Sequence, residues 1–388
     1  MRKKICILAF SPIARDARVL RQIKYLLPHY DMVVIGYGAP PPEYASHPNV
    51  QWITLPDPKS SLFTKVKSLL FLSFGKILPL FFEIWYWAKR EYRMALKYAT
   101  ANPCDFYHAN DWEMLPVGAK ASQRNSAKLI FDAHEFAPLE QDAFSFRFFK
   151  APAIHHFLKR YTPQVNSTIT VVDAIAAKLL DIYGLSAQVV MNIPENQPVE
   201  PGLTKLDQVR LIHHGVANRD RRLEQMIKVT ALCDARYSLY FMLLGKNDHY
   251  LEQLKEIAQE LAPGRVHFCE PVDPYAVVEE ISQYDIGLYV LDPGKSYNNM
   301  IALPNKFFDF ITAGLAVCIG PSPSMAEFVV RYRNGVVSKS FTPEEIAGLL
   351  NALTADEINA MRKASWEAAQ VLNAENEMKK LTAIYEHL

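Results

Sequence analysis

Short apolar runs recur along the chain and alternate with segments of helical periodicity. Runs of this kind are typical of strands in a parallel sheet that is buried on both faces. In the first half they are KICILAF, DMVVIGYG, NVQWITLP, CDFYH, KLIFDAHEF, STITVV and QVVMNIP. In the second half they are RLIHHGV, SLYFMLLG, VHFCEPV, DIGLYVLDP and AVCIG. Strands that alternate with helices predict an α/β protein with two doubly wound, Rossmann-like domains.

A segment without periodicity separates the two sets of strands. Residues 194–208, PENQPVEPGLTKLDQ, are rich in proline and polar residues and are predicted to form the linker. The predicted N-terminal domain therefore covers residues 1–196, and the C-terminal domain covers residues 197–370. A last helix, predicted from about Asp356 to Leu388, supplies a separate C-terminal segment at 371–388.

The stretch ALPNKFFDFITAGLAVCIG, residues 302–320, predicts a helix that leads into a buried strand. Pro304 suits the first turn of a helix, where a missing N–H costs nothing, and Gly314 suits its end. A helix start offers free N–H groups and a positive dipole end, which favour phosphate. Lys306 in the first turn adds a full charge, and Asp309 about one turn later can accept hydrogen bonds from sugar hydroxyls. This pair predicts a nucleotide-sugar site.

Polar side chains also follow two predicted strands of the first half. Asp111 comes after the strand that ends near His108, and His134 and Glu135 end the strand KLIFDAHE. In an open α/β sheet, ligands bind beyond the carboxyl ends of the strands. Asp111, His134 and Glu135 are therefore the candidate catalytic residues.

Residues 60–98 combine many Leu, Phe and Trp residues with basic ones, and two interpretations of this stretch stay open. Charged residues, Gly75 and Pro79 interrupt it, so it is unsuited to a spanning helix of about 20 apolar residues. A pair of helices in the membrane interface would place aromatic residues among headgroups and basic residues on lipid phosphates. The alternative is a pair of core helices. Residues 144–161 form a second aromatic and basic stretch. It is predicted either to extend that membrane face or to cover an acceptor groove.

Charge and cysteine content indicate where in the cell the protein works. Residues 1–196 hold 23 Lys and Arg against 16 Asp and Glu, whereas residues 197–388 hold 19 against 25. A basic first half indicates contact with an anionic surface, with neutral drift of surface charge as the alternative. Five scattered cysteines fit a reducing compartment, and the apolar run after the basic N-terminus is too short for a signal peptide. We expect a cytoplasmic protein, peripherally associated with the inner face of the plasma membrane.

Several motifs resemble those of the bacterial glycosyltransferases of the two-domain GT-B fold, family four. PNKFFDFITAGLAV is similar to their "lPnKlfEylaaGlPvi", DAHE matches another pattern, and Arg18 falls in a segment like "DpRV". An alternative interpretation is that Asp16 and Arg18 form a local ion pair on the surface. Two departures concern the sugar end of the site: Asp309 replaces the usual Glu, and Ile301 stands where a second Glu is common.

The resemblance implies two domains that face a central cleft, with the last helix crossing back onto the first domain. It implies that Arg219 and Arg221 bind the donor diphosphate, together with Lys306, and that the backbone at Pro271 and Val272 meets the nucleotide base. His134 would face the donor sugar and the acceptor hydroxyl.

The implied function is transfer of a sugar, with retention, from a UDP- or GDP-linked donor to a lipid-linked or other saccharide acceptor in envelope polysaccharide or glycolipid synthesis. No cofactor and no nucleic-acid partner are expected. No two Asp residues are separated by one residue, so the DxD element of metal-dependent sugar transferases is absent, and the reaction is predicted to be metal-independent. A nucleotide-sugar epimerase of the same fold, or a catalytically weak partner subunit of an assembly complex, are the alternatives.

Overall fold

A computed structural model describes residues 2–58, 61–195, 197–205, 207–245, 249–273, 276–294 and 296–388, without the side chains of Leu62 and Phe63. The described chain forms two compact units. Unit 1 consists of Met1–Met191, Ser296–Asn298 and Met378–Leu388, and unit 2 of Asn192–Lys295 and Asn299–Glu377. The sequence placed the boundary at residue 196. It gave no sign that the three residues Ser296–Asn298 belong to the first unit.

Unit 1 is built on a parallel sheet of seven strands in the order β3-β2-β1-β4-β5-β6-β7. The strands are β1 Lys4–Pro12, β2 Asp31–Tyr37, β3 Val50–Thr54, β4 Phe106–Asn110, β5 Lys128–Ala133, β6 Ser167–Thr170 and β7 Ala187–Val189. Residues on the central strands are fully buried, as the uninterrupted apolar runs predict.

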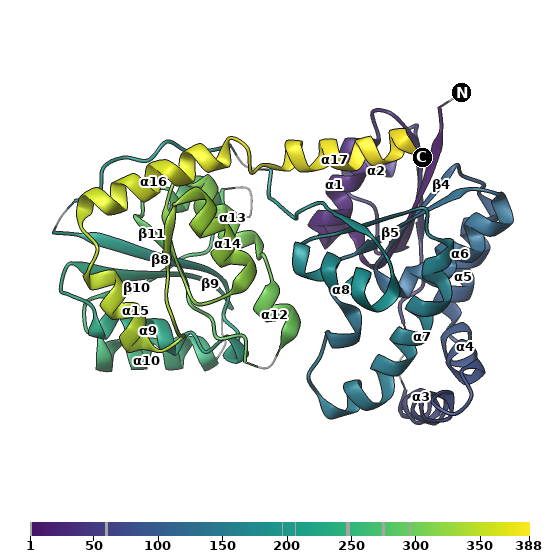
Figure 1. Cartoon of the computed structure of the whole chain (residues 1–388), viewed down its shortest axis with the longest axis horizontal. Helices are drawn as coiled ribbons and strands as arrows, with labels where there is room; N and C mark the ends of the chain where they lie inside the picture. Colours follow the sequence, from purple (N-terminus) through teal and green to yellow (C-terminus); the bar gives the residue numbers. More distant parts are fainter. Residues whose placement is uncertain are drawn as a thin grey trace. The chain divides into compact units, whose positions relative to one another are not determined.

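Helices cover both faces of this sheet (Figure 1). The α-helices are α1 Ala17–Leu26, α2 Pro42–Ala45, α3 Leu62–Gly75, α4 Leu80–Trp87, α5 Arg90–Ala101, α6 Asp111–Asn125, α7 Ala151–Tyr161, α8 Asp173–Tyr183 and α17 Ala374–His387. The shorter turns are η1 Ile13–Arg15, η2 Ala137–Leu139, the π-helix η3 Phe146–Lys150 and η4 Thr162–Gln164. The C-terminal part of α17 joins the core of β1, β2 and α1 through Leu381, Ile384 and Tyr385.

Unit 2 repeats the plan with six parallel strands in the order β10-β9-β8-β11-β12-β13. The strands are β8 Val209–Val216, β9 Tyr237–Leu244, β10 Val266–Cys269, β11 Ile286–Tyr289, β12 Ala316–Ile319 and β13 Gly335–Val337. The helices are η5 Arg219–Arg221, α9 Glu224–Leu232, α10 His249–Leu261, α11 Val277–Ile281, α13 Asn305–Thr312, α14 Pro323–Tyr332, α15 Pro343–Asn351 and α16 Ala355–Ala369. Helix α12 Tyr297–Ile301 begins in unit 1 and ends in unit 2. Helices α9, α10 and α15 pack together, and α13, α14 and α16 form a second group.

Both strand orders reverse direction at one point, and that point predicts where a ligand binds. In unit 1 the reversal lies between β1 and β4, and in unit 2 between β8 and β11. All the strand pairs within the two sheets are parallel, so the carboxyl ends of each sheet lie on one edge. Ligands of open α/β sheets bind at this edge, in the crevice where the strand order reverses.

Three helices occupy the aromatic and basic stretch in which the sequence predicted a pair. Gly75 and Pro79 end one helix and begin the next, as predicted, and a further break near Lys89 separates α4 from α5. Arg93 stabilises this break, since it donates hydrogen bonds to the carbonyls of Trp87 and Ala88. The last helix is likewise divided, into α16 and α17.

One side of this stretch is packed into the unit, as the interpretation of core helices predicts, and the other side is exposed. Phe82, Trp85 and Tyr86 are buried, and Glu83 ties α4 to α7 through His156 Nε2 at 3.2 Å. The outer side is apolar and exposed, and we call it the α3–α4 surface. It consists of Val66, Leu69, Leu70, Phe74, Ile77, Leu78, Leu80 and Ile84, with Phe144 and Phe148 beside them. None of the helices in the described ranges is long and apolar enough to cross a membrane.

Candidate functional site

A cavity of about 290 Å³ opens at the point in unit 1 where the strand order reverses. Its walls come from the end of β1, the turn from β4 into α6, and the segment after β5. Asp111, His134 and Glu135, which the sequence singled out, all line it. The parallel register explains this convergence, because β4 pairs with both β1 and β5.

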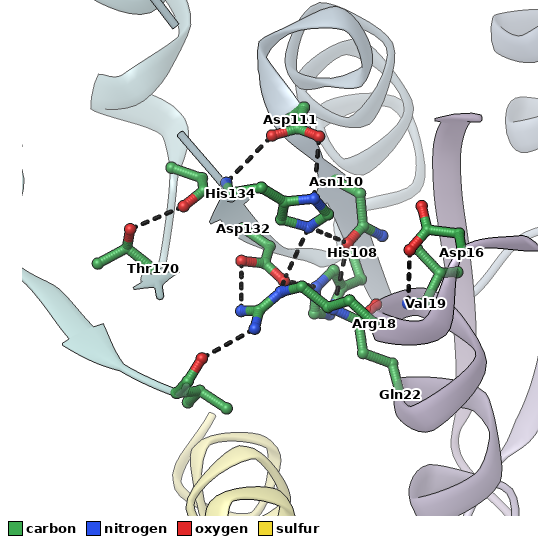
Figure 2. A network of polar contacts seen from close by, with 12 residues as sticks. Asp16, Arg18, Val19, Gln22, His108, Asn110, Asp111, Asp132, His134 and Thr170 are labelled. Carbon is green, nitrogen blue, oxygen red and sulfur yellow. Dashed lines mark hydrogen bonds and ion pairs between the residues drawn. The ribbon is translucent and has the colours of Figure 1, made fainter. Parts of the chain in front are cut away.

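His134 lies between two carboxylates (Figure 2). Its Nδ1 is 3.0 Å from Asp111 Oδ2, and its Nε2 is 3.4 Å from Asp132 Oδ2 and 3.1 Å from Asn110 Oδ1. Burial opposes the charged ring, but the two carboxylates raise the pKa of His134 to about 10. The side chain is thus an imidazolium at neutral pH, with both N–H groups donated. It can stabilise negative charge, and it is not a general base.

Asp132 is held in turn by a buried arginine. The Arg18 guanidinium donates to both oxygens of Asp132 at 2.7 Å, and Gln22 Nε2 donates to Oδ2 at 2.7 Å. Burial would raise the pKa of Asp132, but Arg18 and His134 hold it well below its usual range. The alternative of a surface pair between Asp16 and Arg18 is wrong. Asp16 instead caps α1 by accepting a hydrogen bond from the backbone N–H of Val19 at 3.2 Å.

A residue of the C-terminal helix reaches this network from the other side. Tyr385 of α17 shares a hydrogen bond with His108 Nδ1 at 2.5 Å, and His108 Nε2 is 3.7 Å from Asp132 Oδ2. His108 is fully buried, which lowers its pKa. The sequence had no means of linking Tyr385 to this site, because 277 residues separate it from His108.

The backbone at Asp111 is strained. Its φ of +59° lies in the left-handed region, at the first residue of α6. This region costs most residues about 1–2 kcal/mol, and Asp and Asn tolerate it best. The turn presents both carboxylate oxygens to His134, since Oδ1 accepts the backbone N–H of His134 at 3.1 Å. Strain of this kind concentrates at functional sites.

Two further acids line the cavity. Burial, followed by the charge of Asp111, raises the pKa of Glu113 to about 8, so this carboxyl is mostly protonated at neutral pH. The pKa of Glu135 is also raised, by desolvation and by the nearby Glu140. Sequence reasoning missed Glu113, although its position in NDWE, two residues after Asp111, was a usable signal. A carboxyl that titrates near neutral pH in a cavity is a candidate proton donor or acceptor.

The second candidate site lies in unit 2, at the reversal point between β8 and β11. Helix α13 begins after Pro304, as predicted, and Lys306 in its first turn is buried. Lys306 Nζ lies 3.2 Å from His213 Nε2 on β8. His213 Nδ1 is 2.8 Å from the carbonyl of Leu288 and must donate to it, because a carbonyl only accepts. Nε2 is then the acceptor for the lysine.

Positive charge accumulates around Lys306. Burial and the nearby Arg221 lower the pKa of Lys306 to about 7, although Asp309 opposes the shift. Burial and Lys306 also lower the pKa of His214 to about 3, so this ring is neutral where it lies 3.4 Å from Asp309 Oδ2. An anion at this site would relieve the repulsion between the cations. The sequence did not identify either histidine, although HH in RLIHHGV ends a predicted strand.

Gly215 makes room for the lysine. Its φ is +128°, and a Cβ atom at this position would lie 2.7 Å from Lys306 Nζ. A side chain at this position would therefore strain the backbone and displace the ammonium group.

The remaining residues that the sequence proposed for the nucleotide lie elsewhere in unit 2. Arg219 donates to Gln253 Oε1 at 2.6 Å and lies over the ring of Tyr250, both on α10. Arg219 and Arg221 lie in the short turn η5, which precedes α9. Pro271 and Val272 follow the edge strand β10 and are half-buried. Only Arg221 has an electrostatic interaction with Lys306.

No group of three or more His, Cys, Asp or Glu side chains in the described chain is placed to hold a metal ion. All five cysteines are free, and four of them are buried.

Two doubly wound α/β units, each with a site at the reversal of its strand order, define the GT-B fold. Known structures with this fold match the whole chain. They include HepE from Anabaena in complex with UDP and glucose (16% identity, 100% of both chains, TM-score 0.67). Sucrose-phosphate synthase from Thermosynechococcus elongatus matches at 13% identity over 100% of this chain and 99% of the other, with a TM-score of 0.71. WaaG, a glycosyltransferase involved in lipopolysaccharide biosynthesis, matches at 15% identity over 98% of both chains, with a TM-score of 0.62.

These identities establish the fold alone. No family model and no curated protein matches the chain.

Proposed function

We propose that the protein is a retaining, metal-independent glycosyltransferase that uses a UDP- or GDP-linked sugar, and that it is a bacterial member of the family-four group. The observation that carries the proposal is Lys306, a buried cation in the first turn of α13, next to Arg221. The structural neighbour HepE is known in complex with UDP-glucose, which supports a nucleotide-sugar donor.

The proposed chemistry follows from where charge develops. Sugar transfer passes through an oxocarbenium-like state, and negative charge grows on the departing diphosphate. Lys306, Arg221 and the N–H groups at the start of α13 would stabilise this charge, because donors that are already oriented need no reorganisation during the reaction. Asp309 would accept hydrogen bonds from the ribose hydroxyls, and Arg219, Pro271 and Val272 would complete the nucleotide site.

The cavity of unit 1 would receive the acceptor and the donor sugar. His134, as an imidazolium, would stabilise negative charge or bind a sugar hydroxyl, and Asp111 would hold its orientation. Glu113, with a pKa of about 8, is the group best suited to exchange a proton with the acceptor hydroxyl.

The acceptor is proposed to be lipid-linked, in envelope polysaccharide or glycolipid synthesis at the inner face of the plasma membrane. The α3–α4 surface supports this, because Ile77 is 83% exposed and Phe144 76% exposed, and Lys76 Nζ lies over the ring of the neighbouring Phe148. Each basic residue near an anionic leaflet adds about 1 kcal/mol to attachment.

A thermal-shift experiment with UDP, GDP and their sugar conjugates tests the donor site. A nucleotide at 100 times its dissociation constant stabilises the fold by about 2.7 kcal/mol, which raises the melting temperature by about 5–10 °C. The variant Lys306→Met should lose this shift, whereas Lys363→Met, which changes an exposed lysine on α16 of the same unit, should retain it. If no nucleotide or nucleotide sugar shifts the melting temperature, the proposal fails.

One observation favours a second candidate, a catalytically weak partner subunit. Ile301 ends α12 and is 5% exposed, so hydrocarbon occupies the position where the resembling family has a Glu. Slow hydrolysis of the bound donor distinguishes the two functions, because an enzyme releases the nucleotide whereas a binding subunit returns the donor intact.

A further inference from the structure

A second and larger cavity lies in unit 1, with a volume of about 660 Å³. It is bordered by α3, the junction between α4 and α5, and the loop that follows β3, and Leu69 belongs both to its lining and to the α3–α4 surface. A volume of this size is ordinary for a small-molecule site. The catalytic residues named above do not line this cavity, so it needs its own explanation.

The walls of this cavity are largely apolar and firmly held. Leu72 and Trp85 are 7% and 5% exposed, and Phe71 lies beside them. Trp85 Nε1 donates a hydrogen bond to Ser68 Oγ at 3.0 Å, which fixes α3 to α4. The apolar walls are therefore part of the folded unit, and they suit a hydrocarbon ligand.

Positive charge is placed among these apolar groups. Four basic side chains line the cavity, against the two carboxylates of Asp57 and Glu91; they are Lys65, Lys67, Lys89 and Arg90. Lys89 Nζ lies 4.2 Å from the ring centroid of Trp85 and 5.0 Å from that of Tyr92. Burial lowers the pKa of Lys89 to about 8. In the described ranges no carboxylate forms an ion pair with Lys89, so an anionic ligand would stabilise its charge.

The two cavities of unit 1 meet at one side chain. Phe10, near the end of β1, lines both the large cavity and the smaller one that holds Asp111 and His134. Its ring packs on Tyr37 and Tyr92, with centroid distances of 5.0 and 4.8 Å. A molecule that occupies both cavities would pass over Phe10.

We propose that the large cavity binds the apolar, phosphate-bearing end of the acceptor while the acceptor's hydroxyl lies in the smaller cavity. This inference rests on the proposed function and specifies its acceptor as an amphiphile with a phosphate next to hydrocarbon. A free anion would leave the apolar walls in contact with water, and a neutral apolar ligand would leave Lys89 without a directly paired anion, although Glu91 and Glu113 act on its charge from a distance. Only a ligand with both parts satisfies both features of the cavity.

Direct binding of a simple amphiphile tests the proposal. Dodecyl phosphate, kept below its critical micelle concentration, is titrated into the full chain by calorimetry, with dodecyl maltoside and inorganic phosphate as comparisons. We expect one dodecyl phosphate per chain, bound at least about tenfold more tightly than either comparison. Equal affinity for inorganic phosphate would identify a plain anion site, and equal affinity for dodecyl maltoside a plain apolar one. Either result overturns the proposal.

Two variants locate the occupant. Ala88→Trp fills the cavity from an exposed position, and Lys89→Met removes the charge; each should weaken dodecyl phosphate by about tenfold or more. Lys97→Met, which changes an exposed lysine of α5 outside the cavity, should bind like the wild type. If Ala88→Trp does not fold, the affinity of Lys89→Met for dodecyl phosphate tests the proposal. Wild-type binding by a folded Lys89→Met variant overturns the proposal.

A third variant separates this cavity from the α3–α4 surface. Ile77→Asp should reduce sedimentation with phosphatidylglycerol vesicles and leave dodecyl phosphate binding unchanged. Loss of dodecyl phosphate binding in Ile77→Asp would place the amphiphile on the surface and overturn the proposal. UDP binding is measured on the same samples. Failure to bind dodecyl phosphate with intact UDP binding overturns this inference alone, whereas failure to bind UDP overturns the proposed function.

Discussion

The two candidate sites occupy the same place in two similar sheets, yet their charges are arranged in opposite ways. In the site of unit 1 the two cations each have a carboxylate partner, since Arg18 lies against Asp132 and His134 against Asp111. In unit 2 the cations lie near one another, and Lys306 contacts a neutral histidine.

The proton states follow from this difference. Carboxylate neighbours raise the pKa of His134 to about 10, whereas burial and a cationic neighbour lower that of Lys306 to about 7. In the first site the two cations are already paired with carboxylates, and this network orients His134. The second has an excess of positive charge that an anion would balance. The same topology thus supports a permanent charge on His134 in unit 1 and a charge on Lys306 in unit 2 that a bound anion can induce.

The largest effect should come from breaking the paired network of unit 1. Asp132→Asn leaves the Arg18 charge buried without its counter-charge, and we expect a loss of about 3–5 kcal/mol in the free energy of unfolding. Arg18→Met with Asp132→Leu removes both charges and should cost less than the single variant. Urea unfolding measures both. A single variant within about 1 kcal/mol of the wild type would contradict the assigned role of the pair.

The second prediction concerns the pH range over which His134 stabilises the fold. An unfolded histidine has a pKa of about 6.5, and the folded one has a pKa of about 10. The stabilisation is therefore fully present below pH 6.5 and is lost as the pH rises from 6.5 towards 10. Unfolding measured between pH 6 and 10 should show this decline.

The matched variant for this prediction is Asp111→Asn, because Asn tolerates the left-handed backbone at this position. Removal of the carboxylate should lower the pKa of His134 by about 1 to 3. Histidine resonances observed by NMR report the change directly. If His134 of the wild type titrates near pH 6.5, the two carboxylates do not raise its pKa, and the prediction is wrong.

The third prediction tests the charge that a ligand induces in unit 2. A bound diphosphate should raise the pKa of Lys306, so binding takes up a proton when the free lysine is largely neutral, above pH 7. Affinity for UDP should then be greatest below pH 7 and fall as the pH rises through 7 towards the pKa of the complex. Calorimetry at pH 8 in buffers of different ionisation enthalpy counts the protons.

Lys306→Met should lower UDP affinity about a hundredfold at pH 6 and remove the proton uptake. Lys306→Arg is the control, because its charge does not depend on pH in this range. Proton uptake that persists in Lys306→Met would assign the linkage to another group.

The sequence predicted every strand except β13 correctly, together with the contributions of Pro304, Gly75 and Pro79, because these depend on local patterns. Apolar runs form buried strands, and proline and glycine end helices, whatever lies elsewhere in the chain. The breaks that divide α4 from α5 and α16 from α17 were missed. Arg93 stabilises the first of these breaks through backbone carbonyls, and such contacts leave no periodic signal.

Parts of the candidate sites could be predicted for a related reason. Asp111 and His134 follow strands, and the topology of parallel sheets brings strand ends together. The partners of these residues could not be predicted, since Arg18 meets Asp132 across 114 residues and Tyr385 meets His108 across 277. Contacts of this range depend on packing in three dimensions.

The smallest expected effect concerns Asp309, the carboxylate that acts electrostatically on Lys306. Asp309 is 8% exposed and raises the pKa of Lys306, so Asp309→Asn should lower that pKa and also remove an acceptor for the ribose hydroxyls. We expect UDP affinity to fall about tenfold, with the fold intact. Thermal unfolding without ligand checks the fold, and Asp356→Asn, on the exposed first turn of α16, is the matched control. Because deoxy-UDP lacks the 2′-hydroxyl, it should lose less affinity than UDP in the Asp309→Asn variant. Equal losses for the two nucleotides would mean that Asp309 acts only through the charge of Lys306, and an unchanged UDP affinity would remove Asp309 from the site.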